Sequence, residues 1–336
     1  MFTRMLGFGA VGLIGLAIAA VLYLVIDALS FSEFLQIGVI ALSAMVPVTL
    51  AAVGEIIGER AGVINIGLEG ILLISAIVGA YAAEQGGTYL GEALAPFIGL
   101  LAGILVGLIL GMLHGLVSVY WKGNHIISGV GINLLGAGFV AFGLIALWGI
   151  AGYHPVPSWA RMPQLPTPYG GISYVTFLTL ALAVAVYWLV YRTKLGIRIG
   201  VVGEHPRSAD VAGVNVDATR FWATAIGASF AGLGGAFMSL DWFGVVTSEL
   251  AAGRGFIGLA TVVFSKLNPL LAIVGGLIFG FFDSLAVWVS NSSELKQVLP
   301  WQFVRTLPYV VTLLAVAGAL GRARFPSKLG EPYYRE

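Results

Sequence analysis

The stretch LAPFIGLLAGILVGLILGMLHGLVS, residues 94–118, contains no Asp, Glu, Lys or Arg. A helix of about 20 apolar residues is long enough to cross the hydrocarbon core of a bilayer, which is about 30 Å thick. Within the stretch, glycine recurs at every fourth position and forms one slowly rotating stripe along a helix: Gly99, Gly103, Gly107, Gly111 and Gly115. We therefore expect a membrane-spanning helix with a second helix packed closely against its glycine stripe.

The whole chain has the composition of a membrane protein. Of its 336 residues, 59% are hydrophobic and 10% are charged, whereas a soluble domain has about 25% charged residues. The formal net charge of +1 offers no basic field that would hold nucleic acid. The sequence has no cysteine, which excludes disulfides, thiol nucleophiles and cysteine-ligated metals. We predict an all-α integral protein of the cell (inner) membrane with no nucleic-acid partner.

Further apolar stretches suggest about ten crossings in a single transmembrane domain over residues 1–325, followed by a cytoplasmic tail over 326–336. These stretches are roughly 6–26, 36–54, 62–83, 125–149, 174–191, 221–240, 250–265, 268–290 and 303–320. Residues 250–265 are the shortest and begin at Gly253-Arg254-Gly255, so a broken or re-entrant helix is the alternative there. We favour a full crossing, since a re-entrant segment would leave the basic end of the chain outside.

The positions of the basic residues agree with this topology. With the N-terminus inside, 13 of the 17 Lys and Arg residues fall in cytoplasmic segments and four lie outside or near outer helix ends. Cytoplasmic loops of membrane proteins collect Lys and Arg. Both termini are therefore predicted to be cytoplasmic.

Two segments resemble each other within the chain. AGVINIGLEG, starting at Ala61, and AGRGFIGLAT, starting at Ala252, are identical at five of ten positions. In the predicted topology the two copies run in opposite directions across the membrane. Inverted repeats of this kind are typical of transporters, whose solute path lies between the repeats near the bilayer midplane.

Few polar side chains occur at membrane depth, where a charged residue costs about 2.5–3.5 kcal/mol on insertion scales. We expect Asn65 and Glu69 to share one face of the third helix because they are four residues apart. The candidate substrate pathway consists of Asn65, Glu69, Asn133, Gly253, Gly255 and Asp283. The alternative interpretation is that these polar groups bond one another or nearby backbone and lock helices together.

No catalytic or metal-binding pattern is present in the sequence. The four histidines are scattered without an H-E-x-x-H arrangement, and neither G-x-S-x-G nor the phosphate-binding G-x-x-x-x-G-K-[ST] occurs. We predict a protein that is not an enzyme and binds no metal or cofactor. Any ATP hydrolysis would take place on a partner chain.

The longest predicted cytoplasmic segment is RTKLGIRIGVVGEHPRSADVAGVNVDATR, residues 192–220. Pro206 suits the first turn of a helix, and Gly213 suits its end. We expect a short surface helix over about 206–212 that couples the membrane domain to an ATPase. A solvated connector with an incidental turn is the alternative.

ERAGVINIGLEG from Glu59, the segment from Arg192 to Val216, and GRGFIGLATVVFSKLNPLLAIVGGLIFG from Gly253 resemble the permeases of ATP-binding-cassette importers. The likeness is to the nucleoside and simple-sugar type within the branched-chain amino acid permease superfamily, and it is closest to the nucleoside type. It implies a second permease subunit, identical or homologous, a cytoplasmic ATPase, and an extracytoplasmic solute-binding lipoprotein. It also places the ATPase-coupling residues at Gly203, Glu204, Pro206, Arg207, Ala209, Ala212 and Gly213.

The predicted external loop 150–173 contains five of the 13 prolines, which favour extended backbone. It is either a docking rim for the binding protein or a plain connector. The sequence thus predicts a permease for a nucleoside, with a simple sugar or a branched-chain amino acid as the alternative substrate. An ion-coupled secondary transporter, which would work without an ATPase, is the alternative of another class.

Overall fold

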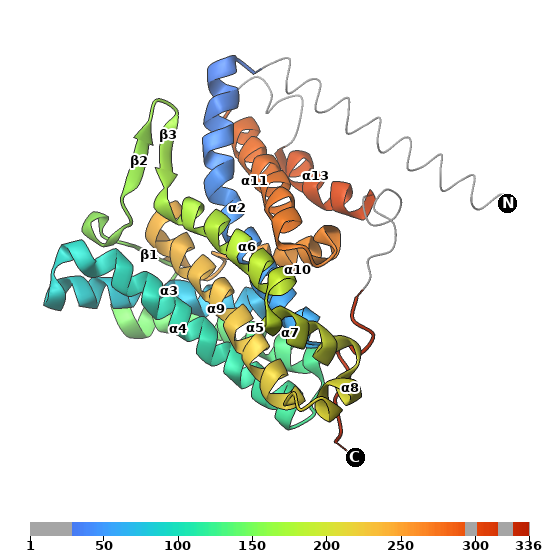
Figure 1. Cartoon of the computed structure of the whole chain (residues 1–336). Coiled ribbons are helices and arrows are strands. Elements are labelled where there is room, and N and C mark those ends of the chain that lie inside the picture. The colour runs from blue at the N-terminus through green and yellow to red at the C-terminus, as the bar shows by residue number, and fades with distance from the viewer. Residues whose placement is uncertain (1–28, 293–300, 315–324, 336) are drawn as a thin grey trace.

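The structure is a computed structural model that describes residues 29–292, 301–314 and 325–335. The described chain is mostly helical, as predicted (Figure 1). Its α-helices are α2 (Phe31–Arg60), α3 (Leu68–Leu90), α4 (Ala95–Gly115), α5 (His125–Trp148), α6 (Tyr174–Arg192), α7 (Lys194–Glu204), α8 (Pro206–Val211), α9 (Val216–Phe237), α10 (Arg254–Ser265), α11 (Pro269–Asn291) and α13 (Trp301–Leu314). Short 3-10 turns η1 (Glu92–Leu94) and η3 (Ser158–Ala160) and π turns η2 (Leu116–Tyr120) and η4 (Met238–Trp242) extend or join them.

Seven helical segments of the described chain are long and apolar enough to cross a membrane. They are Phe31–Arg60, Leu68–Leu90, Glu92–Tyr120, His125–Trp148, Tyr174–Arg192, Val216–Trp242 and Pro269–Asn291. The first predicted span, residues 6–26, lies outside the described residues, as does the end of the last. α10 has 12 residues, which at 1.5 Å per residue is about 18 Å of helix, too short to span a bilayer on its own. The total of ten crossings and the placement of both termini stay predictions.

The glycine stripe of α4 lies against α9, so the expected close helix contact is present. A Cβ atom added at Gly107 would lie 2.5 Å from the carbonyl oxygen of Ala228 and 2.8 Å from Cα of Gly232. α9 also packs against α2 and α3, and Phe237 near its end is fully buried among them. The core of the bundle therefore lies where α2, α3 and α4 surround α9 (Figure 1).

The predicted external loop contains short β-strands, so the prediction of an all-α fold needs correction. β2 (Gln164–Thr167) and β3 (Gly170–Ser173) form an antiparallel hairpin, and β1 (Tyr153–Pro155) pairs antiparallel with β4 (Val245–Thr247). Buried Asp241 accepts hydrogen bonds from Gln164 Nε2, at 2.5 Å, and from the Ser173 hydroxyl. These bonds join the loop to η4, the turn that follows α9, and no local sequence spacing indicated this partner.

We expect Gly107→Ala to destabilise the protein, because a methyl group there overlaps backbone of α9. Overpacking of this kind costs roughly 1–3 kcal/mol. The matched control is Gly138→Ala on α5, where a Cβ would meet no atom within 4 Å. Thermal unfolding of the two purified variants in detergent checks the prediction. Equal midpoints for both would show that α4 and α9 are not held at this distance.

Candidate functional site

The segment between α2 and α3 departs from the predicted helix. Residues 61–67 are irregular, and α3 begins only at Leu68. α2 ends where Gly62 adopts a left-handed conformation with φ of +94°, which favours glycine because it has no Cβ. Asn65 therefore precedes the helix, and the expectation that Asn65 and Glu69 share a helical face is wrong.

Side chains from three helices hold the backbone of this irregular segment. The Ile64 amide donates to His125 Nδ1 at 3.3 Å, and the Ile64 carbonyl lies 2.9 Å from His114 Nε2. The Asn65 amide donates to Glu55 Oε1 at 2.7 Å. These contacts assign the proton of His114 to Nε2 and leave Nδ1 of His125 unprotonated. All three polar side chains are buried, so they replace water as partners of the segment.

Asn133 on α5 bonds the same segment from the other side. Its Nδ2 donates to the Ile66 carbonyl at 3.0 Å, and its Oδ1 accepts from the Gly70 amide at 2.8 Å. The Oδ1 atom of Asn65 accepts from the Gly67 amide at 2.9 Å, while buried Asn65 Nδ2 has no partner among the described residues. Asn133 thus locks the segment in place, and Asn65 keeps a donor available.

Glu69 joins the two repeated segments. Its Oε1 accepts from the Gly253 amide at 2.6 Å, and its Oε2 accepts from the Gly255 amide at 2.7 Å. The carboxylate therefore caps the N-terminus of α10, where a negative charge meets unpaired amides and the positive end of the helix dipole. A Cβ at Gly255 would lie 2.6 Å from Cα of Glu69, which explains the need for glycine there.

Gly62 and Gly253 occupy the same position in the two repeated segments. Both have positive φ, +94° and +84°. The chains then differ, because α10 starts directly after Gly253 while five irregular residues separate Gly62 from α3. The inverted relation of the two segments stays a prediction.

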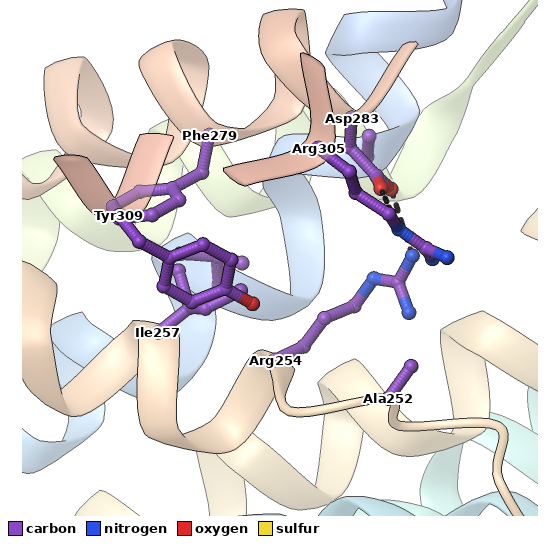
Figure 2. Close-up of a pocket in the computed structure, with 9 residues that line it drawn as sticks. Ala252, Arg254, Ile257, Phe279, Asp283, Arg305 and Tyr309 are labelled. Atoms are coloured by element: carbon purple, nitrogen blue, oxygen red, sulfur yellow. Dashed lines mark hydrogen bonds and ion pairs between the residues drawn. The ribbon is translucent and has the colours of Figure 1, made fainter. Parts of the chain in front are cut away.

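Arg254, the residue after Gly253, lies in a charged cluster at Asp283 (Figure 2). Its Nη2 is 2.8 Å from Asp283 Oδ2, and Arg305 Nε on α13 is 3.4 Å from Asp283 Oδ1. The Arg254 guanidinium also lies over the rings of Trp242 and Phe243, at 4.6 and 5.3 Å from their centroids. Ionisable residues placed this way in a membrane bundle indicate a functional site.

The cluster lies between two adjoining cavities. The smaller, of about 30 Å³, is lined on its far side by Phe279 and Tyr309, whose rings meet edge to face (Figure 2). The larger, of about 430 Å³, extends past Trp242 and Phe243, and its volume lies within the usual range of small-molecule pockets, about 300–1,000 Å³. The two cavities share Ala252, Arg254, Asp283 and Arg305.

The structure brings Glu69, Gly253, Gly255 and Asp283 to this region. Asn65 lies in the irregular segment, and Asn133 bonds that segment from α5. Sequence reasoning missed Arg254, Arg305, Trp242, Phe243 and Tyr309 as members of the site. The charge of Arg254 inside the repeated motif was a usable signal. The other four come from separate elements, and no motif joined them. No cluster of three or more metal-ligating side chains occurs among the described residues.

The predicted surface helix is present as α8. Pro206 is its first residue, and Gly213 follows it with φ of +82°. Glu204, Arg207 and Ala212 are exposed, whereas Pro206 and Ala209 are buried. Gly203, at the end of α7, packs so close to the end of α2 that a Cβ there would lie 3.1 Å from the Gly62 amide nitrogen. The predicted coupling segment and the irregular segment are therefore neighbours.

Comparison with known proteins places this arrangement among transport proteins. Residues 37–316 match the family described as branched-chain amino acid transport system, permease component. The guanosine ABC transporter permease protein NupQ of Bacillus subtilis is 33% identical over 303 residues, or 86% of this chain and 93% of the relative. The nucleoside ABC transporter permease protein NupC of Lactococcus lactis is 31% identical over 298 residues, again 86% and 93% of the two chains. A putative glucose ABC transporter permease, TsgC13 of Haloferax volcanii, is 32% identical over 318 residues, 85% and 94% of the two.

We expect Glu69→Gln to destabilise the contact between α3 and α10. The amide side chain keeps one acceptor oxygen and turns a donor toward the second backbone amide, so one charge-assisted hydrogen bond is lost, about 1.5–3 kcal/mol. The control is Glu92→Gln, because Glu92 is exposed at the start of η1. Thermal unfolding in detergent compares the two, and an unchanged midpoint for Glu69→Gln would refute the capping role.

Proposed function

Because this chain belongs to the permease family of branched-chain amino acid transport systems, we propose that it forms the solute pathway of an ATP-binding-cassette importer for a nucleoside. Permeases of this family are non-catalytic subunits of the cell membrane that work with an ATPase and a solute-binding protein. The observation that carries the proposal is the similarity to the guanosine permease, which extends over 93% of that relative.

The chemistry of the larger cavity supports a nucleoside. The stacked rings of Trp242 and Phe243, 4.2 Å apart, offer an apolar face for a nucleobase. Asp283 carries acceptor oxygens suited to the hydroxyl groups of a ribose, and Arg254 supplies donors. A simple sugar is the nearest alternative, since hydroxyl groups and an apolar ring face are common to both substrates.

In this proposal the six predicted pathway residues have three different roles. Asp283 contacts the solute. Glu69, Gly253 and Gly255 form the fixed wall beside it, and Asn65 and Asn133 hold the segment that carries Glu69. The pathway lies between the two repeated segments, in keeping with the inverted repeat expected from the sequence.

α8 would fit a groove on the ATPase, with Gly203, Glu204, Pro206, Arg207, Ala209, Ala212 and Gly213 as the coupling segment. Contact of Gly203 with the end of α2 gives movement of α8 a short route to the irregular segment. ATP binding would then favour one of two openings of the bundle, and the solute shifts this equilibrium only through contacts that differ between the openings. The complex would contain a second permease subunit and an extracytoplasmic lipoprotein.

Transport by the reconstituted complex tests this function. Proteoliposomes are prepared with the permease pair, the ATPase and the binding protein. They should transport labelled guanosine only when ATP is present on the side of the membrane that carries the ATPase. Unlabelled nucleosides should compete, and glucose or leucine should not. An ATPase variant unable to hydrolyse ATP is the control. Competition by glucose alone would assign a sugar, and uptake driven by an ion gradient without ATP would assign a secondary transporter.

The coupling role of α8 predicts a specific effect of Gly213→Ala. A Cβ at Gly213 meets no atom within 4 Å, so the penalty comes only from its φ of +82°, roughly 1–2 kcal/mol for a residue with a Cβ. We expect uptake per ATP hydrolysed to fall about fivefold or more with membrane insertion unchanged. Gly200→Ala on α7, where a Cβ also meets nothing and φ is ordinary, should have no effect. A wild-type ratio of uptake to ATP hydrolysis in both variants would refute the coupling role of α8.

A further inference from the structure

Residues near the C-terminus are built into the end of the bundle that carries α7 and α8, although the sequence suggested only a tail. Residues 325–335, the C-terminal strap, lie beside α7 and α8 (Figure 1). The Ser327 amide donates to Glu204 Oε2 at 3.0 Å, and the Ser327 hydroxyl donates to the Glu204 carbonyl at 2.5 Å. The Lys328 amide donates to the Gly203 carbonyl at 3.2 Å. The strap is thereby joined to the end of α7.

A second set of contacts joins the strap to α8. The Tyr333 hydroxyl donates to Asp210 Oδ2 at 3.0 Å, and Arg335 Nε lies 3.1 Å from the same oxygen. The Tyr333 ring packs on a small apolar cluster in which Ala209 of α8 is buried. α8 has only six residues, and two side chains of the strap bond one of them, Asp210.

A third set of contacts joins the strap to the irregular segment. The Gly330 amide donates to the Gly62 carbonyl at 2.9 Å. Arg220 on α9, which is 2% exposed, donates to the Glu331 carbonyl at 2.7 Å and to the Val202 carbonyl at 3.5 Å. A Cβ at Gly62 would lie 2.9 Å from Arg220 Nη2. One buried guanidinium is thus in contact with the strap, α7 and the turn that opens the irregular segment.

We propose that the C-terminal strap and Arg220 carry the movement of α8 to the irregular segment 61–67, which makes Arg220 a positioning residue for transport. This rests on the proposed function, because it presumes that α8 receives the movement of an ATPase. The physical reason is the pattern of bonds. α8 is joined to α7 through His205 and to α9 through residues 212–215, and the strap adds bonds that fasten α8, α7 and Gly62 to one backbone. Movement of any one of them then strains the hydrogen bonds to the other two.

Truncation of the chain after residue 324 tests the proposal. In reconstituted complexes we expect ATP hydrolysis to continue while uptake per ATP hydrolysed falls about fivefold or more. Tyr333→Ala should lower the same ratio, and Tyr334→Ala, which changes an exposed neighbour, should leave it unchanged. Arg220→Ala should lower the ratio, and Arg220→Lys should restore it in part because it keeps a charged donor. A purely structural role would reduce the amount of assembled complex without changing the ratio.

A cross-link decides whether the strap moves with α7 and α8 or must detach from them. The sequence has no cysteine, so Glu204→Cys with Ser327→Cys introduces a single thiol pair. Oxidised and reduced samples of this one variant are matched in every other respect. The proposal expects uptake per ATP in the oxidised sample to equal or exceed that in the reduced sample, because the disulfide replaces the bonds between Glu204 and Ser327 that the two substitutions remove. Loss of uptake on oxidation would show a lid that has to open, and would overturn the proposal.

The outcomes are separable from those of the proposed function. If the wild-type complex shows no ATP-dependent nucleoside uptake, the proposed function fails. If it does show such uptake, and the truncated chain keeps the wild-type ratio of uptake to hydrolysis, only the role of the strap is refuted.

Discussion

Backbone that leaves the helical conformation inside an apolar bundle must find its hydrogen-bond partners within the protein, because no water is present to supply them. Residues 61–67 are such a segment. Glu55, His114, His125 and Asn133 bond its amides and carbonyls from α2, α4 and α5. Each buried group left without a partner would cost about 1–3 kcal/mol. These hydrogen bonds therefore fix the positions of α2, α4 and α5 relative to the segment.

The same segment connects the two ends of the proposed transport mechanism. Directly after its C-terminal end, Glu69 in the first turn of α3 caps α10 beside the pocket formed at Asp283. At its N-terminal end, Gly62 contacts α7 and the C-terminal strap. A displacement of α7 or the strap thus reaches the pocket through a short length of chain that side-chain hydrogen bonds hold in place. Such a connection needs the segment to be rigid, and the side chains that satisfy its backbone supply that rigidity.

Features governed by local sequence could be predicted, and features that depend on distant partners could not. Seven of the predicted apolar spans, the α4 glycine stripe and α8 follow from composition, periodicity and helix-end residues, and the described residues contain them. The late start of α3 could not be predicted, because residues 61–67 are as apolar as a helix and their partners lie on other helices. Asn133 was recognised as a buried polar residue, but its bond to Ile66 spans 67 positions. The contacts of the strap with α8 and the pairing of β1 with β4 join residues far apart in the sequence, and no nearby sequence pattern indicated either.

Hydrogen–deuterium exchange of the backbone amides in detergent or lipid nanodiscs tests the central role of the irregular segment most directly. The amides of Asn65, Gly67, Gly70, Gly253 and Gly255 each donate to a buried or partly buried side-chain oxygen. They should exchange as slowly as the amides in the middle of α2 and α9, although three of them belong to no regular helix. Exchange as fast as that of exposed residues 150–152 would show that the segment is open to water, and would contradict its role as the fixed centre of the fold.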